Sequence, residues 1–199
     1  MRIQIPPAVL KAHLKIAPAK DIRFYLNGVS LEVTADGGVF VASTDGKTLL
    51  ASRVPSGAVE DPAPGSWIIP RDSLALVDLG SKTDIEVRIV DREIELISFG
   101  GNSIRTKAVD GEFPYWRRAI PTGTPSGAGG QFDPDVFAKF AFVAKTLGHK
   151  GEFPFFWCNG AAATMVTFGS GEHVGVAMPL RAIPDNQFAV PDWVNGGQS

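Results

Sequence analysis

Cysteine is almost absent from this chain, because Cys158 is the single one among 199 residues. One cysteine cannot form a disulfide within the chain, and it cannot supply the two or more thiolates of a cysteine-based structural zinc site. Low cysteine content is typical of a reducing compartment, so we expect a cytoplasmic location. We expect no metal ion and no other cofactor.

Long apolar runs are lacking as well. A membrane-spanning helix needs ~20 consecutive apolar residues, and every apolar run in this chain is much shorter. Met1 leads into a short proline-containing segment in place of an apolar signal region. The sequence therefore predicts neither membrane association nor export.

An excess of charge of one sign is also missing. The chain has 19 Lys and Arg against 21 Asp and Glu, which gives a formal net charge of −2. Binding to phosphates depends on the local density of cations, so this balance excludes a protein that coats nucleic acid by a general excess of Lys and Arg. It permits a basic strip on an acidic body. The length and the 44% hydrophobic content fit one large or two small globular domains.

The sequence does contain a unit that recurs, namely a short amphipathic helix followed by alternating strands. In the first unit we expect a helix between the prolines at 6–7 and Pro18, and strands at about 22–26, 29–34, 38–44 and 47–53. In the second unit we expect a strand at 67–69, a helix over 72–79 that Gly80 ends, and strands at about 85–90, 92–98 and 103–109. Asp-Gly pairs between strands indicate antiparallel hairpins.

A third unit follows the Gly/Pro-rich stretch 122–131, which predicts a linker. Asp133 is expected to cap a helix that ends at Gly148, with strands at about 153–157, 161–168 and 173–178. One unit buries little surface alone, so we expect it to complete itself against another subunit. The predicted organisation is a two-unit domain over 1–121, a linker over 122–131, a half domain over 132–182 and a tail over 183–199.

The sequence contains no complete catalytic motif among those that its residues suggest. The segment 46–48 (Gly-Lys-Thr) matches the end of a phosphate-binding loop, but Val41 stands where the leading glycine belongs, and a strand follows. Cys158 lies in an aromatic strand, where a buried, inert thiol is the usual finding. No catalytic or metal-ligand spacing connects the three histidines, His13, His149 and His173. The sequence predicts no enzyme, and the alternative of a β-rich enzyme would need a site built on Cys158 or His173.

Basic residues gather on or beside the expected helices. They are Lys11, Lys15, Lys20, Lys82, Lys139, Lys145, His149 and Lys150. If the three helices line one surface, that surface is positive and the sheets carry most of the acidic residues. The alternative is that these side chains only form the solvated faces of amphipathic helices. Spacing alone favours the alternative.

Five segments carry a family resemblance, in the same order along the chain. They are DIRFYLNG (21–28), STDGKTL (43–49), IIPR (68–71), VDGEFPYWRRAIP (109–121) and VAMPLR (176–181). The first four resemble the middle domain of the bacterial DNA polymerase III beta subunit, the sliding clamp, and the last is similar to the closing motif of that family. The resemblance is strong over about residues 5–121 and, apart from the closing motif, weaker over 131–182.

The resemblance implies an α+β DNA-clamp fold, in which antiparallel sheets form the outside of a ring and helices line its inside. Such a ring encircles duplex DNA and tethers a replicative polymerase. Lysines that face the pore would bind the phosphate backbone without reading sequence, which permits sliding. The candidate DNA-facing residues are Lys11, Lys15, Arg23, Lys139 and Lys145.

The resemblance also implies a hydrophobic cleft for short linear motifs of polymerases and clamp-loading proteins. By motif position, its residues are Arg23, Leu26, Thr44, Leu49, Pro70, Leu74, Val176 and Met178. An apolar groove with adaptable Met and Leu side chains can hold the aliphatic and aromatic anchors of a peptide. The alternative is that these residues simply belong to the core.

The chain departs from the family in its length, because family members have three two-unit domains and close as dimers. Three units per chain would close a ring of roughly a dozen units as a homo-tetramer, with half domains meeting across two-fold axes. We expect a nucleoid-associated protein of a phage, prophage or plasmid replicon. The second hypothesis is a regulatory or decoy protein that binds clamp-motif peptides and forms no ring.

Overall fold

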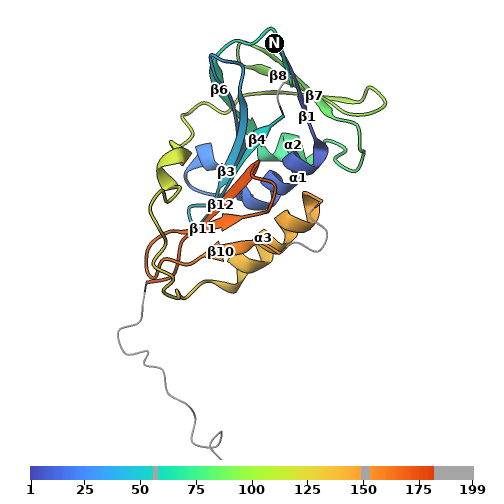
Figure 1. Ribbon diagram of the computed structural model, residues 1–199. Helices are drawn as coiled ribbons and strands as arrows, with labels where there is room; N and C mark the ends of the chain where they lie inside the picture. Colours follow the sequence, from blue (N-terminus) through green and yellow to red (C-terminus); the bar gives the residue numbers. More distant parts are fainter. Residues whose placement is uncertain (56–57, 149–152, 182–199) are drawn as a thin grey trace, which may run out of the picture.

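The computed structural model describes residues 1–55, 58–148 and 153–181. In this part of the chain, two antiparallel sheets are packed with three α-helices and two short 3-10 helices (Figure 1). His149, Lys150 and the predicted tail over 183–199 lie outside the described residues. The α+β class expected from the sequence is confirmed.

The larger sheet has seven strands in the order β10-β11-β12-β4-β3-β2-β6, all paired antiparallel. They are β2 (Gly28–Val33), β3 (Val39–Thr44), β4 (Thr48–Val54), β6 (Gly65–Pro70), β10 (Phe155–Trp157), β11 (Thr164–Thr167) and β12 (His173–Ala177). The smaller sheet has the order β5-β1-β7-β8-β9. Its strands are β1 (Arg2–Ile5), β5 (Val59–Glu60), β7 (Ile85–Val90), β8 (Glu93–Ile97) and β9 (Ser103–Lys107).

The units are interlocked by strands that cross between sheets. The strand β6 leads the second unit but pairs with β2 of the first, with Gly28 opposite Pro70. The strand β1 leads the first unit but pairs with β7 of the second, with Ile5 opposite Ile85. The third unit joins the larger sheet through β12, which pairs with β4. The predicted boundary over 122–131 therefore separates two parts of one continuous sheet.

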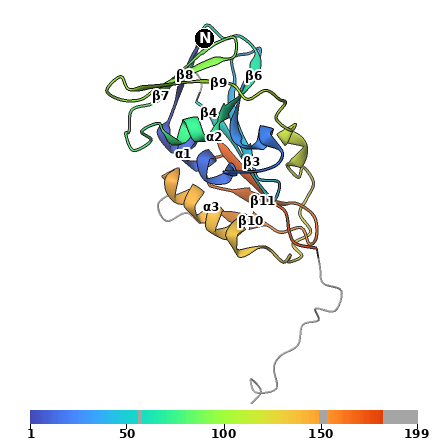
Figure 2. The same cartoon turned by 180° about the vertical axis from the view of Figure 1, so that it is seen from behind.

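The three helices lie against the larger sheet, as both views show (Figures 1 and 2). They are α1 (Pro7–Ile16), α2 (Arg71–Ala75) and α3 (Pro134–Thr146), and α1 contacts α3, β3 and β4. The helix α1 starts at a proline, which suits the first helical turn because its missing N–H would be unpaired there anyway. Asp133 caps α3 as expected, since its Oδ1 accepts a bond of 3.0 Å from the Asp135 N–H.

The apolar side chains form three clusters, and β4 shows why. Successive residues of a strand point to opposite faces, so Leu50 points to the helix side while Leu49 and Ala51 point to the other side. One cluster fills the space between the two sheets, α1 and α2. A second contains Leu50 and joins α1 and α3 to β11 and β12, with Phe140 and Phe168 fully buried. The third is small and lies on the opposite face of the larger sheet.

The predicted strand over 22–26 is wrong, because these residues form the 3-10 helix η1 (Phe24–Leu26) and the turn before it. The side chain of Asn27 closes this loop: it accepts from the Asp21 N–H at 2.7 Å and donates to the Asp21 carbonyl at 2.9 Å. The alternation of apolar residues at 22, 24 and 26 resembles a strand, but these local side-chain bonds decide the backbone path.

Other boundaries also differ from expectation. The helix expected over 72–79 ends at Ala75, because the Leu76 and Val77 N–H groups bond to carbonyls three residues earlier and no longer continue an α-helix. Gly80 therefore ends no helix. The strands β1 and β5 were not expected, and the linker 122–131 contains neither helix nor strand.

Candidate functional site

Four of the predicted cleft residues come together on the face of the larger sheet that is turned away from the helices. Thr44 is in register with Leu49, and Leu49 is in register with Val176. Residues directly opposite one another on paired strands share a face, so these three form a row. Met178 follows β12, and its N–H donates to the Lys47 carbonyl at 2.8 Å. The row thus unites segments more than 120 positions apart in the sequence.

The apolar part of this row is covered by residues that were not expected in the site. Leu49, Ala51 and Val176 form a buried cluster, and the partly buried side chains packed on it are Trp116, Ile120, Ala163 and Val174. Trp116 belongs to the 3-10 helix η2 (Trp116–Ala119) and Ile120 follows it, in the segment that crosses the outer face. Their signal in the sequence was the motif over 109–121, which carries apolar residues without helix or strand periodicity.

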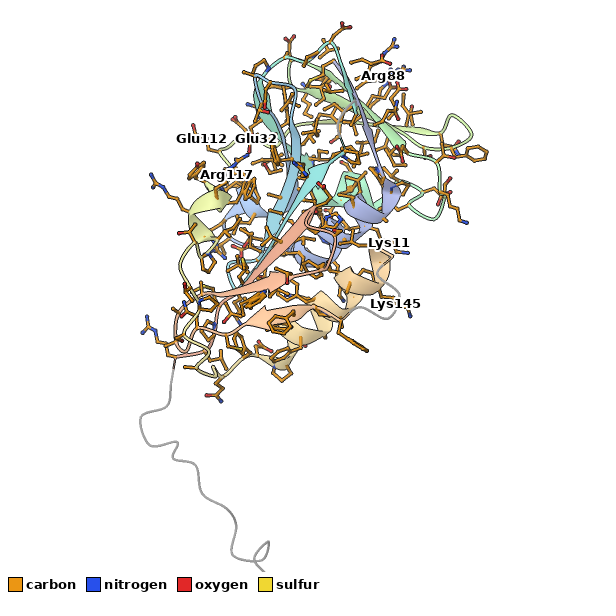
Figure 3. The ribbon with its side chains drawn as sticks, in the orientation of Figure 1. Lys11, Glu32, Arg88, Glu112, Arg117 and Lys145 are labelled. Atoms are coloured by element: carbon orange, nitrogen blue, oxygen red, sulfur yellow. The ribbon has the colours of Figure 1, made fainter. Side chains whose placement is uncertain are left out.

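Charged groups hold this crossing segment against the sheet. Arg117 of η2 donates to Glu32 Oε2 of β2 at 2.7 Å, and the two side chains point toward one another in Figure 3. The Trp116 indole N–H donates to the same oxygen at 3.3 Å. The Arg117 guanidinium also lies 4.1 Å from the Trp116 ring and 4.9 Å from the Phe40 ring, which is within cation–π range. The outer face is therefore a built surface, in which the crossing segment covers the apolar cluster.

Arg23 lies at the open end of the row, beside the β3–β4 turn. Its guanidinium donates to both carboxylate oxygens of Asp21, at 2.9 and 2.8 Å, and to the Asp45 carbonyl at 3.3 Å. The side-chain bond from Arg23 is the main cause that lowers the pKa of Asp21 to about 2. The side chain of Arg23 remains exposed, so it places a cation beside the β3–β4 turn.

Asp45 ties this turn to α3. Burial of Asp45 opposes its ionisation, but bonds from the Lys139 ammonium and from the Thr48 hydroxyl and N–H outweigh that effect and lower its pKa. Lys139 is therefore paired with Asp45. A second link joins Lys47 to Asp133 at 3.4 Å. Lys139, one of the DNA-facing candidates, thus has an acidic partner at the turn.

Leu26 and Leu74 are buried, and Pro70 lies level with Thr44 but two strands farther along the sheet. Leu74 of α2 is fully buried in the cluster between the sheets, which favours the reading that it belongs to the core. Leu26 of η1 is also buried. Pro70 pairs with Gly28 at the β6 edge, and three strand spacings of about 4.8 Å separate it from β4. Pro70 therefore lies ~14 Å from Leu49 across the sheet.

The other DNA-facing candidates lie on the helices. Lys11 and Lys15 are exposed on α1 and Lys145 is exposed on α3, and Figure 3 shows Lys11 and Lys145 on the same side of the molecule. The Lys15 ammonium lies 5.5 Å from the centroid of the Phe142 ring on α3. Among the described residues, no carboxylate forms an ion pair with these three lysines. We call Lys11, Lys15 and Lys145 the basic helix face.

Two of the three histidines, His13 and His173, lie in a network of serine hydroxyls. His13 is fully buried, and its two ring nitrogens bond at 2.9 Å to the Ser43 and Ser52 hydroxyls. The same Ser52 hydroxyl lies 2.8 Å from His173 Nδ1. The pKa of His13 is lowered to about 3. Burial is the main cause, and the charge of His173 is a lesser one. This network joins α1 to β3, β4 and β12.

The described residues offer neither a metal site nor a membrane-spanning helix. Within 1–55, 58–148 and 153–181, no three His, Cys, Asp or Glu side chains group in a way that could hold a metal ion. The same ranges contain no helix with the length and apolar content needed to cross a membrane.

The arrangement of two sheets with helices on one side and crossed leading strands is that of a DNA clamp. Two solved structures show this fold: the DNA polymerase III subunit beta of Pseudomonas aeruginosa, with a TM-score of 0.67, and the sliding clamp of Bacillus subtilis, with 0.70. Each match covers 92% of this chain, with 66% and 65% of the solved chains. The identities are 18% and 14%, so these matches establish the fold alone.

Sequence comparison identifies the family within that class. The family described as DNA polymerase III beta subunit, central domain, matches residues 8–115, which is more than half of the chain. The chain therefore belongs to this family, and the resemblance found in its motifs is confirmed. It is 29% identical over 129 residues to the beta sliding clamp of Caulobacter vibrioides and 34% identical over 110 residues to that of Pseudomonas aeruginosa.

The chain matches only part of these curated relatives. The first alignment covers 60% of this chain and 33% of the Caulobacter protein, and the second covers 52% of this chain and 28% of the Pseudomonas protein. The matched region therefore spans about a third of the length of the relatives.

Proposed function

We propose that this protein is a non-enzymatic DNA sliding clamp, a processivity factor that encircles duplex DNA and tethers a replicative polymerase. The observation that carries the proposal is the β4–β12 pairing. It sets Leu49 of the family-matched region against Val176 of the third unit, with Met178 beside them, on the outer face of a clamp fold.

The row formed by Thr44, Leu49, Val176 and Met178 is the proposed docking site for short linear motifs of polymerases and clamp-loading proteins. Leu49 and Val176 are buried, so they support the site from below, and the surface offered to a peptide is formed by Met178 and the side chains that cover the cluster. Met178 is 44% exposed and flexible, which suits adaptation to aliphatic or aromatic anchors. Arg23 at the end of the row can pair with an acidic residue of the peptide.

The basic helix face is the proposed DNA contact. Its lysines have no acidic partner in the described part of the chain and can bind phosphates with small loss of existing interactions. Such contacts carry no sequence information, and they exchange easily between phosphates. We assign the same surface to the inside of a homo-tetrameric ring, in the cytoplasm and associated with the nucleoid.

The replacement Met178→Glu tests the docking site. The new carboxylate would lose hydration when an apolar anchor covers it, so the affinity for a synthetic clamp-motif peptide should fall at least about ten-fold. Fluorescence anisotropy of the labelled peptide measures this loss. The matched control is Val90→Glu, which puts the same charge on another exposed apolar position, in β7, and should leave the affinity unchanged.

An unchanged affinity of the Met178→Glu variant would place peptide binding elsewhere. The ring is tested on the same preparation, because a closed ring stays on nicked circular DNA and runs off the linearised form. Peptide binding without retention on circular DNA would favour the regulatory or decoy protein.

A further inference from the structure

The two sheets end in four edge strands, and three of these edges are protected against pairing with another chain. An edge strand presents unpaired N–H and C=O groups unless charge, proline, short length or a covering segment prevents it. The strand β9 carries exposed Arg105 and Lys107, and β5 is two residues long. The edge of β6 is covered where the Val109 N–H donates to the Ile68 carbonyl at 2.9 Å.

The fourth edge, β10, is also short, at three residues, but within the described residues it carries no charge, no proline inside the strand and no covering segment. Its three residues, Phe155, Phe156 and Trp157, are aromatic and uncharged. Phe155 is 57% exposed and Trp157 is 41% exposed, and their rings contact one another at 4.6 Å. Phe153 just before the strand is 88% exposed. This edge lies beside α3 at the end of the molecule opposite the smaller sheet (Figures 1 and 2).

The other two units show what belongs at this position. The first strand after α1 is β2, which is covered by β6 of the second unit. The first strand after α2 is β7, which is covered by β1 of the first unit. The first strand after α3 is β10, and within the described residues no strand pairs with its outer edge. In the first two units the covering strand is the one that leads the other unit, and the described stretch that leads into α3 forms no strand, so the outer edge of β10 stays open within the described residues.

We propose that β10 pairs antiparallel with β10 of a second copy of this chain, across a two-fold axis. An isologous contact sets the same surface against itself, so it is favoured where the surface carries no charge. Pairing centred on Phe156 sets Phe155 opposite Trp157 of the partner subunit, and aromatic cross-strand pairs stabilise sheets. The larger sheets of two copies then become one continuous sheet.

This inference deepens the proposed function, because it names the surface through which two half domains meet. The contact itself does not depend on a closed ring, but its biological role rests on the proposed ring. The exposed rings of Phe153, Phe155 and Trp157 would be covered by the contact, which explains why they stand uncovered in one chain. Phe156 stays with its own chain, packed between Phe137 and Phe140.

The double variant Phe155→Lys and Trp157→Lys tests the contact. Each lysine would face a lysine of the partner subunit, and like charges directly opposite one another destabilise a sheet. Both positions are exposed, so the charges need not be buried in the single chain. Light scattering across a range of concentrations should show the molar mass reduced to half of the wild-type value or less. The matched control is Phe99→Lys, at an aromatic residue that is 68% exposed, and it should keep the wild-type mass.

Thermal unfolding checks that the double variant is folded, and a second pair, Phe155→Thr with Trp157→Thr, removes the rings without adding charge and should weaken association less. A wild-type protein that is monomeric at all concentrations, or a folded double variant with the wild-type mass, overturns the proposal. Clamp-motif peptide affinity is measured on the same samples. If it is retained while the mass is unchanged, the β10 contact fails and the docking site stands.

Discussion

At the scale of single residues, the surroundings of His13 make the stability of the fold depend on pH. Its ring is buried between two serine hydroxyls, and its pKa falls from 6.5 to about 3. Between these values the unfolded chain binds a proton at His13 and the folded chain does not. Lowering the pH below 6.5 therefore favours unfolding, with a slope of up to about 1.4 kcal/mol per pH unit from this residue.

Urea unfolding between pH 7.5 and pH 5 measures this slope, in a range above the ordinary pKa of Asp and Glu. The variant His13→Gln keeps hydrogen-bonding groups near the serines and has no proton to take up, so its free energy of unfolding should depend less on pH. Equal slopes for the two proteins would show that the His13 ring can accept a proton inside the folded chain.

Site residues were predicted where a family motif lies on a recognisable strand. Site residues outside such strands were missed. Thr44 and Leu49 lie on strands whose alternation was visible, and the structure brings them to Val176 as a row. Trp116 and Ile120 were not assigned, because their segment has no periodicity and its path over the sheet depends on distant contacts with Glu32 and Phe40. Leu74 was assigned by position in a motif, and packing makes it core.

At the scale of elements, the basic helix face is defined by where its positive charges lie and not by how many there are. Replacing Lys11 and Lys15 by Gln should weaken binding to a labelled duplex and lower the slope of log affinity against log salt by about 0.9 for each lysine that contacts a phosphate. Fluorescence anisotropy from low to moderate salt measures both. The matched control is Arg105→Gln with Lys107→Gln, which removes two positive charges from the edge strand β9.

The two variants have the same net charge, so equal losses of affinity would mean that overall charge governs binding. The control residues are held by Glu95 at 2.9 Å and Glu93 at 3.2 Å, whereas Lys11 and Lys15 have no such partner in the described residues. We therefore expect the loss in the helix variant alone.

Elements with local signals were predicted well. The helix α3 has an N-cap, an apolar stripe and a closing glycine, and its boundaries were close to those expected. The strands β1 and β5 were not predicted, because each is defined by a partner far away in the sequence, such as Ile5 opposite Ile85. The leading strands β1 and β6 each pair with a strand of the other unit. This crossing arises only when the sheets assemble, so no short stretch of the sequence indicates it.

At the scale of the whole molecule, the β4–β12 junction makes three units into one body. The larger sheet continues from the first unit into the third, so the half domain has a fixed direction relative to α1. In the proposed assembly, a two-fold axis joins the third unit to the third unit of a second copy. Closure then needs a second contact between the two-unit domains.

Two kinds of contact that alternate around a ring predict a homo-tetramer, so the molar mass should be about four times the 21.2 kDa of one chain and independent of concentration. Light scattering over a hundred-fold dilution measures this. A stable dimer would contradict the tetramer, because only one of the two contacts would then form, and such an open assembly would slip from circular DNA. A tetramer that dissociates to dimers and not to monomers on dilution would show which contact is stronger, and the Phe155→Lys and Trp157→Lys variant would then reveal whether β10 forms it.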